Sequence, residues 1–222
     1  MRLTLIGDLL ATTPGDKEIY ANFIANKAYE GVEDAKQKEQ IKKNIEAELD
    51  NIDEEIAGTL EKGTTFFFKD KKGNPYIYSY LIKGFLKAAC GSLRKVNGTL
   101  SSKIKAYKKE IDTLFFVFPD EKKPQGREIP LELSGPLTMY ERPLRAQTMQ
   151  GERIGLARSE RAPAGTTLEF DICMLRESDE ALLKELLDYG KFSGLGQFRS
   201  AGFGAFTWEE VKPKKTTKKK AS

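Results

Sequence analysis

Apolar residues between positions 32 and 60 recur with a helical period. Their successive intervals are four, four, three, four and four, for Ile41, Ile45, Leu49, Ile52, Ile56 and Leu60. This spacing places them on one narrow stripe of an amphipathic helix. Lys and Glu residues four positions apart fill the opposite face and support a solvated helix. The stripe is expected either to pack inside the chain or to meet a coiled-coil partner.

Two further stretches have helical spacing. Between 80 and 90 the apolar residues Leu81, Phe85, Ala88 and Ala89 share one face, and Ser79 is a candidate N-cap. Ser178 precedes a third helical segment, 179–189, which has acidic residues in its first turn. A short helix is also expected within 16–28. The pattern therefore predicts two helices after residue 78, each flanked by β-prone runs.

Alternating or continuous apolar runs mark the strands. They fall at 2–12, 64–70, 76–78, 112–118, 129–133, 137–139, 166–175 and 204–211. The run 112–118 is apolar on both faces, which is typical of a central strand. When the insertions are removed, the order becomes βαββαβ. This order predicts an α+β protein with a ferredoxin-like (RRM-like) core, a helical insertion and a protruding basic loop.

Length and composition favour one domain over residues 1–211, with the helical insertion at about 28–62 and the basic loop at about 140–162. The tail, 212–222, carries six lysines and no long apolar side chain, so we expect it to be disordered. Such a tail favours polyanions, although it also serves as a plain solubilising end.

The absence of histidine removes the usual general base and the commonest metal ligand. We expect no catalytic residues, no metal and no cofactor, and we consider an enzyme the less favoured reading. Cys90 and Cys173 lie in apolar segments without metal-type spacing, which predicts buried free thiols in a reducing, cytoplasmic compartment. No apolar stretch approaches the length of a membrane span.

The segment 190–206 concentrates five glycines and four phenylalanines around Lys191 and Arg199. Glycine permits positive φ and close backbone approach, and bare amides bind phosphate oxygens. The aromatic rings are suited either to stacking on bases or to anchoring the loop in the core. The plain alternative is a Gly-rich turn between a helix and the last strand.

The formal net charge of +4 is distributed unevenly, and three basic zones are candidate nucleic-acid contacts. The first is on the 80–90 helix, the second lies within 140–161, and the third is the Gly-rich segment. Their candidate residues are Lys83, Lys87, Arg142, Arg145, Arg153, Arg158, Gln197, Arg199 and Ser200. Arginine forks fit phosphate, and an apolar Met149 tip is suited to wedging between bases. A core helix with solvated lysines and a salt-bridged surface loop are the corresponding structural readings.

Three stretches, taken in order, resemble the RAMP superfamily of CRISPR-associated proteins, and above all its guide-RNA-binding backbone subunits. Residues 69–84 resemble the family turn with "Pro-Tyr-Ile" before a "Leu-Lys-Gly" helix start; Tyr78 and Tyr80 stand where members often have Pro and Ser. Residues 159–170 are similar to the strand entry "Glu-x-Val-Pro-x-Gly-Thr-x-Phe". Residues 194–204 look like the terminal Gly-rich loop of the family. Together these stretches frame residues 66–211.

The resemblance implies sequence-independent binding of single-stranded RNA by a cytoplasmic structural subunit. Such a subunit self-associates along guide RNA, together with other effector subunits, in a CRISPR-type ribonucleoprotein complex of antiviral defence. Some relatives cut target RNA with an aspartate in a loop before the "Pro-Tyr-Ile" stretch. Residues 56–68 contain no Asp, so that activity is not expected here.

Other functions stay open from the sequence. One is a phage or mobile-element protein of the same fold that binds single-stranded DNA or RNA. Another is a protein-interaction mimic of such a subunit, working through the acidic helix. The third is metal-independent RNA cleavage, in which Lys, Tyr or Arg stabilises the transition state.

Overall fold

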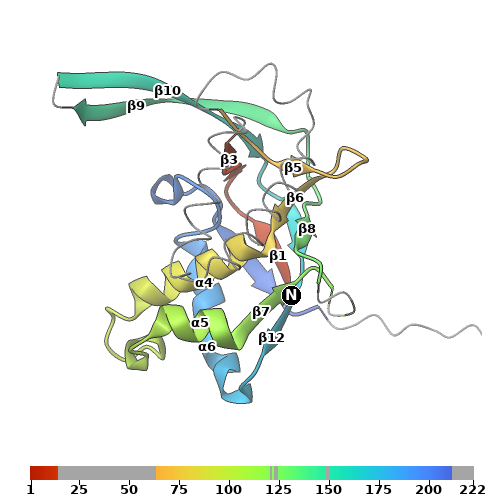
Figure 1. Cartoon of the computed structure of the whole chain (residues 1–222), viewed down its shortest axis with the longest axis vertical. Helices are drawn as coiled ribbons and strands as arrows, with labels where there is room; N and C mark the ends of the chain where they lie inside the picture. Colours follow the sequence, from red (N-terminus) through yellow and green to blue (C-terminus); the bar gives the residue numbers. More distant parts are fainter. Residues whose placement is uncertain (15–63, 121, 123–124, 149–150, 212–222) are drawn as a thin grey trace, which may run out of the picture.

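The fold was analysed in a computed structural model, which describes residues 1–14, 64–120, 122, 125–148 and 151–211 (Figure 1). Of residues 144–148 and 151–155 only the backbone is described. The expected helices at 16–28 and 32–60 and the lysine-rich tail lie outside these ranges. The described part combines helices with several β-sheets, which confirms the α+β class.

The first strand forms the middle of a three-stranded antiparallel sheet. β1 (Arg2–Leu5) pairs with β11 (Thr167–Glu169) on one side and with β13 (Phe206–Glu209) on the other. Alternation places Leu3 and Leu5 on the buried face. Leu3 lies opposite Leu168 and Trp208, and Leu5 lies opposite Phe206, so the apolar face of the sheet is continuous.

A two-stranded sheet follows directly. β12 (Asp171–Met174) begins after a single residue, Phe170, and pairs antiparallel with β7 (Phe115–Phe118). The burial of β7 alternates: Phe115 and Val117 face inward, while Phe116 and Phe118 are partly exposed. Together the two sheets place β13, β1, β11–β12 and β7 side by side.

Helices cover one side of these strands (Figure 1). α4 (Ser79–Leu93) packs against α5 (Tyr107–Leu114), α6 (Glu180–Asp188) and β7. The rings of Phe85 on α4 and Phe206 on β13 meet edge to face at 4.9 Å. Single-turn 3-10 helices accompany them: η1 (Ser101–Lys103), η2 (Glu177–Asp179), η3 (Tyr189–Lys191) and η4 (Arg199–Ala201).

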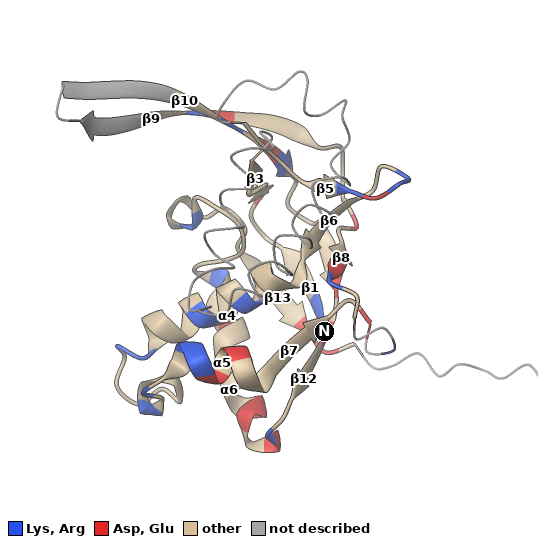
Figure 2. Ribbon diagram, viewed as in Figure 1, with Lys and Arg blue, Asp and Glu red and all other residues tan. Residues whose placement is uncertain are grey.

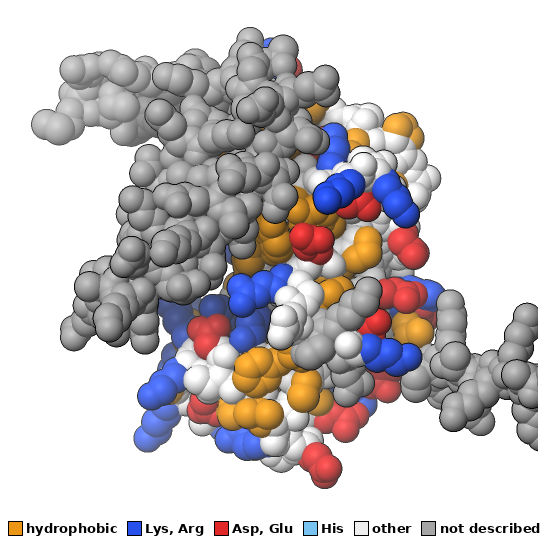
Figure 3. Space-filling view, turned by 45° about the vertical axis from the view of Figure 1, so that its right-hand side comes forward, with side chains coloured by type: hydrophobic (Ala, Val, Ile, Leu, Met, Phe, Trp, Pro, Cys, Tyr) orange, Lys and Arg blue, Asp and Glu red, His pale blue; other side chains and the backbone are white. Residues whose placement is uncertain are grey.

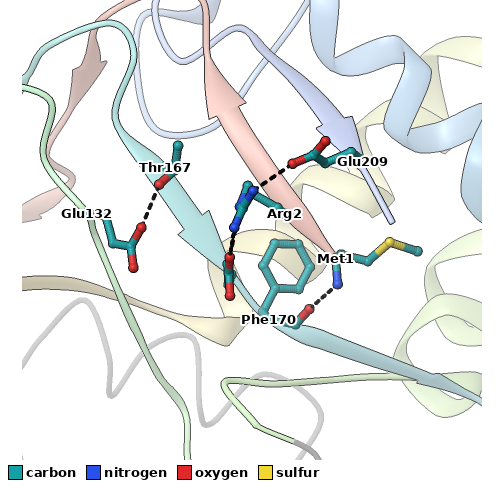
Figure 4. A network of polar contacts seen from close by, with 7 residues as sticks. Met1, Arg2, Glu132, Thr167, Phe170 and Glu209 are labelled. Atoms are coloured by element: carbon teal, nitrogen blue, oxygen red, sulfur yellow. Dashed lines mark hydrogen bonds and ion pairs between the residues drawn. The ribbon is translucent and has the colours of Figure 1, made fainter. Parts of the chain in front are cut away.

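The opposite face of the three-stranded sheet carries a charged network (Figure 4). Arg2 lies between two carboxylates: its Nε donates to Glu169 at 2.8 Å and its Nη1 to Glu209 at 2.9 Å. These contacts raise the pKa of Arg2, the hydrogen bond to Glu169 being the largest cause. The network joins the three strands through their outward side chains.

The remaining strands form two further sheets, one of five strands and one of three. One joins β2 (Leu9–Leu10), β3 (Thr13–Pro14), β4 (Thr64–Phe66) and the long hairpin of β9 (Thr138–Thr148) and β10 (Gly151–Ala162). The other joins β5 (Phe68–Lys69), β6 (Pro75–Tyr78) and β8 (Glu128–Pro130). The hairpin extends away from the helices at the top of Figure 1.

Four sequence-based expectations need correction. Residues 112–114 close α5, and only 115–118 form the strand, because Ile111 and Leu114 continue a helical inward face. Among the described strands β7 pairs with β12 alone, so it is an edge strand and not the central strand that its apolar run predicted. Cys173 is exposed, because its strand position points away from the helices; Cys90 is buried as expected. Tyr78, rather than Ser79, is the N-cap of α4. The ferredoxin-like plan and the domain limits stay predictions.

Within the described ranges, none of the helices has the length and apolar character that a membrane crossing requires.

Candidate nucleic-acid interface

The Gly-rich loop, residues 194–204, is closed at its base by backbone packing. The amide of Leu195 donates to the carbonyl of Gly204 at 2.9 Å. A Cβ on Gly194 would lie 1.6 Å from that same oxygen, so no side chain fits there. Gly196 takes a φ of +75°, and a Cβ on it would lie 2.8 Å from the carbonyl oxygen of Leu10. These three glycines therefore serve chain packing rather than an open phosphate nest.

The tip of the loop is more exposed and is strained. Phe198 is a non-glycine residue with a φ of 56°, a left-handed conformation that costs free energy for such a side chain. Ser200 and Gly202 are exposed beside it, and Arg199 is partly buried. Residues held in this way cluster at binding sites, because the surrounding structure has to enforce them.

A cation–aromatic cluster holds the tip against the base of the hairpin. The Cζ of Arg142, on β9, lies 4.1 Å from the ring centroid of Phe198. The Phe198 ring stacks on that of Phe203 at 5.6 Å, and Phe203 meets Tyr140 of β9 at 4.9 Å. A guanidinium at this distance over a ring makes a cation–π interaction. The hairpin and the loop thus form one surface.

Gln197 ties the same loop to three other segments. Its amide nitrogen lies within hydrogen-bond distance of the Ala11 carbonyl, the Thr65 hydroxyl at 3.0 Å and the Ser159 hydroxyl at 2.8 Å. Its oxygen accepts a hydrogen bond from Nη2 of Arg142 at 3.3 Å. The side chain predicted to contact RNA is therefore engaged with protein groups at both ends.

Two nitrogens of the Arg142 guanidinium are buried donors without an identified acceptor among the described residues. Nε and Nη1 are buried, and within the described part of the chain neither has a hydrogen-bond partner. Leaving a buried charged donor unsatisfied is expensive, so native structures rarely tolerate it without a reason. The guanidinium therefore has donors for an anion or a carbonyl oxygen that the described residues do not supply.

A cavity of about 260 Å³ opens on the other side of the loop. It lies between the loop, the first turns of α4 and the segment around β3. Its lining combines apolar, hydroxyl and cationic groups: Thr12, Thr13, Pro14, Tyr80, Leu81, Gly84, Phe85, Gly194, Leu195, Gly196 and Arg199.

Lys83 and Lys87 lie apart from this cavity. Lys83 Nζ donates to the carbonyl of Asp112 at 3.0 Å and lies 5.1 Å from the ring centroid of Phe116. Lys87 Nζ forms an ion pair with the Asp112 carboxylate at 2.9 Å. Burial is the main cause that lowers the pKa of Lys83. Both lysines thus bridge α4 to α5, and neither lines the cavity.

The other predicted arginines follow the hairpin. Arg158 on β10 forms a cross-strand ion pair with Glu141 at 2.7 Å, directly opposite in register. Arg145 pairs in register with Ile154, and Arg153 with Ala146; their side chains lie outside the described part. The structure therefore gathers Arg142, Gln197, Arg199 and Ser200 at the loop and places Arg145, Arg153 and Arg158 along the hairpin.

A further basic surface lies at the other end of α4 and along α5 (Figure 2). In Figure 3 it is part of the blue region at the lower left, whereas most carboxylates lie to the right. Its exposed members are Arg94, Lys95, Lys103, Lys105, Lys108 and Lys109. None of these residues was among the contacts predicted from the sequence.

Sequence reasoning did not single out the aromatic and small residues of the site. Phe198 was one of four phenylalanines with no mark of its left-handed backbone. Tyr80 and Gly84 lie in a helix in which only Lys83 and Lys87 were predicted as contacts. A glycine inside a helical pattern was the available signal, because it lowers helix propensity.

Comparisons with known proteins place few limits on this surface. No family model and no curated protein matches the chain. Among solved structures, it is similar to a chain of the type III-B Cmr-beta complex bound to cognate target RNA, with 14% sequence identity and a TM-score of 0.43. The match covers 95% of this chain and 58% of that chain, so the protein spans well under two thirds of its structural neighbour's length.

Proposed function

We propose that this protein binds single-stranded RNA without reading its sequence. The strand would run along the Gly-rich loop, the cavity beside it and the base of the β9–β10 hairpin. The observation that carries the proposal is the Arg142 guanidinium, which stacks on Phe198 while two of its buried nitrogens have no acceptor among the described residues. A phosphate oxygen would supply such an acceptor if RNA binding displaced the groups that cover these two nitrogens, and it matches the fork geometry of arginine.

The neighbouring groups support the same ligand. Arg199 and Ser200 directly follow Phe198, whose backbone is left-handed. Three further arginines, Arg145, Arg153 and Arg158, lie along the hairpin. Aromatic rings beside cations are the combination by which proteins hold single strands of any sequence. Lys83 and Lys87 would take part only by releasing Asp112.

We also propose that the core is ferredoxin-like and that the protein is a RAMP-type backbone subunit that self-associates along guide RNA. The side-by-side order β13, β1, β11–β12, β7, with helices on one side, supports the first point, since β11 and β12 are separated by one residue. The three sequence stretches described above support the second. Gel filtration with and without a 40-mer of single-stranded RNA tests it, because RNA should shift the protein to multimers.

A salt titration of RNA binding tests the main proposal. The logarithm of the association constant should fall linearly with the logarithm of salt concentration, by about 0.7 per phosphate neutralised. Arg199→Ala should reduce this slope by about that amount. Lys184→Ala is the control, because Lys184 pairs with Glu180 and Glu210 on α6 and after β13, away from the loop. Binding that is undetectable or insensitive to salt would refute the proposal.

A further inference from the structure

The cavity beside the Gly-rich loop has the composition of a site for a flat, partly polar ring. Apolar side chains, including Phe85 and Leu195, make up part of its wall, and Thr12 and Thr13 add hydroxyl groups to the lining. Arg199 stands at the loop side. Pockets that combine apolar walls with a few polar groups bind small organic ligands.

Gly84 gives an independent indication that the cavity is kept open. It lies inside α4, where glycine is less favourable than alanine because it gains no side-chain packing and loses backbone entropy. A Cβ built on Gly84 meets no atom of the described residues within 4 Å. Packing explains the other glycine of this helix, because a Cβ on Gly91 would lie 2.9 Å from the Tyr107 hydroxyl. Packing against the described residues does not explain Gly84, whereas a ligand in the cavity would.

Tyr80 supplies an aromatic surface to the same cavity. It belongs to the first turn of α4, and the residue is 42% exposed although its ring is large and apolar. The ring stacks on that of Tyr78 at 5.5 Å with an interplanar angle of 21°. Tyr78 in turn meets Tyr76 and Phe68, so the ring of Tyr80 is braced by an aromatic cluster. A braced, exposed ring is the type of platform on which nucleobases stack.

We propose that this cavity holds one unstacked nucleobase of the bound strand, with Tyr80 as the stacking surface and Gly84 as the floor. Arg199, which lines the cavity from the loop, would hold the phosphate of the same nucleotide. This inference rests on the proposed function, since it concerns the same RNA. It goes beyond that function because it assigns a base-binding site to a protein otherwise proposed to hold the RNA backbone.

The experiment compares two ligands of equal length and charge. One is a single-stranded oligouridine RNA, and the other is a ribose-phosphate chain that lacks the bases. Fluorescence anisotropy at one fixed salt concentration gives the dissociation constants. The unaltered protein should prefer the base-containing strand by about 5- to 100-fold, the range that stacking of one base on an aromatic ring provides.

Two variants then locate the preference. Gly84→Leu should fill part of the cavity, since its Cβ meets no described atom within 4 Å, and Tyr80→Ala removes the ring. Each variant should bring the two constants together while the abasic chain binds as before. Ser92→Leu is the matched control, because it adds the same side chain to an exposed position of α4 outside the cavity lining. It should leave the preference unchanged. Thermal unfolding of each variant shows that the fold is kept.

Each outcome decides a separate point. Equal binding of both ligands by the unaltered protein would overturn the nucleobase site and leave RNA-backbone binding intact. A preference that persists in both Gly84→Leu and Tyr80→Ala would also overturn it. Binding of neither ligand would refute the proposed function itself, and the nucleobase site with it.

Discussion

Replacing Arg142 with methionine separates a ligand-binding arginine from a structural one, because the two roles predict different combinations of stability and RNA affinity. Methionine keeps most of the length of the side chain and its contact with the Phe198 ring, but removes the charge and all donors. The substitution loses the cation–π contact, worth about 1 to 2 kcal/mol, and the long hydrogen bond to Gln197, worth about 1 kcal/mol.

The same substitution removes a cost. The two buried nitrogens have no acceptor among the described residues, and each then disfavours the folded state by about 1 to 3 kcal/mol, so their removal returns about 2 to 6 kcal/mol. The sum ranges from a loss of about 1 kcal/mol to a gain of about 4 kcal/mol. RNA affinity should nevertheless fall about 10- to 100-fold, because a charge-assisted hydrogen bond contributes about 1.5 to 3 kcal/mol.

Urea unfolding followed by the fluorescence of Trp208, the single tryptophan, measures the stability, and anisotropy of labelled single-stranded RNA measures the affinity. Arg176→Met is the control. Arg176 pairs with Asp179 and Glu110 at 3.0 and 2.9 Å, so its loss should lower stability and leave RNA binding unchanged. If Arg142→Met destabilised the protein by more than about 2 kcal/mol and bound RNA normally, the reasoning would be wrong.

Three further expectations follow from burial and backbone geometry. Gly194→Ala should unfold or displace the loop, because its Cβ would meet the Gly204 carbonyl. No described atom lies near a Cβ on Gly202, so Gly202→Ala should cost only the strain of its φ of +86°, about 1 kcal/mol. Thermal unfolding ranks the two variants, and equal melting temperatures would contradict the packing argument. Cys173 should react with a thiol reagent at once and Cys90 only on unfolding, as absorbance of the released thiolate reports; two fast thiols would contradict the burial of Cys90. Burial also raises the pKa of the Cys90 thiol, so the folded state holds its proton more tightly than the unfolded state does. The stability should therefore decrease as the pH rises above the ordinary thiol pKa, and this decrease should be absent in Cys90→Ala, which pH-dependent urea titrations measure.

Local periodicity was sufficient to locate α4, α6 and the strands that flank them, because each buries one regular face of its own sequence. It misjudged 112–114, where a β-prone composition met a helical inward spacing of Ile111 and Leu114. The local pattern also identified the arginines of the loop and the hairpin as candidate RNA contacts. It could not predict which of them are buried or paired, because the surroundings of each depend on segments far apart in the chain.

Gln197 illustrates that limit. Its amide meets Ala11, Thr65 and Ser159, which are separated from it by 186, 132 and 38 positions. No sequence window contains these groups together. The same holds for the stacking of Arg142 on Phe198. The backbone at Phe198 is left-handed, and the sequence around it does not predict that conformation.

The backbone contact between Gly194 and Gly204 has a consequence for the kinetics of recognition. Because backbone packing already holds the base of the loop, the loop loses little conformational entropy on ligand binding, and less of the interaction free energy is needed to order it. Encounter with a strand should then proceed at a rate set by diffusion and charge, without a slow rearrangement step, and differences between variants should appear in how long the strand stays.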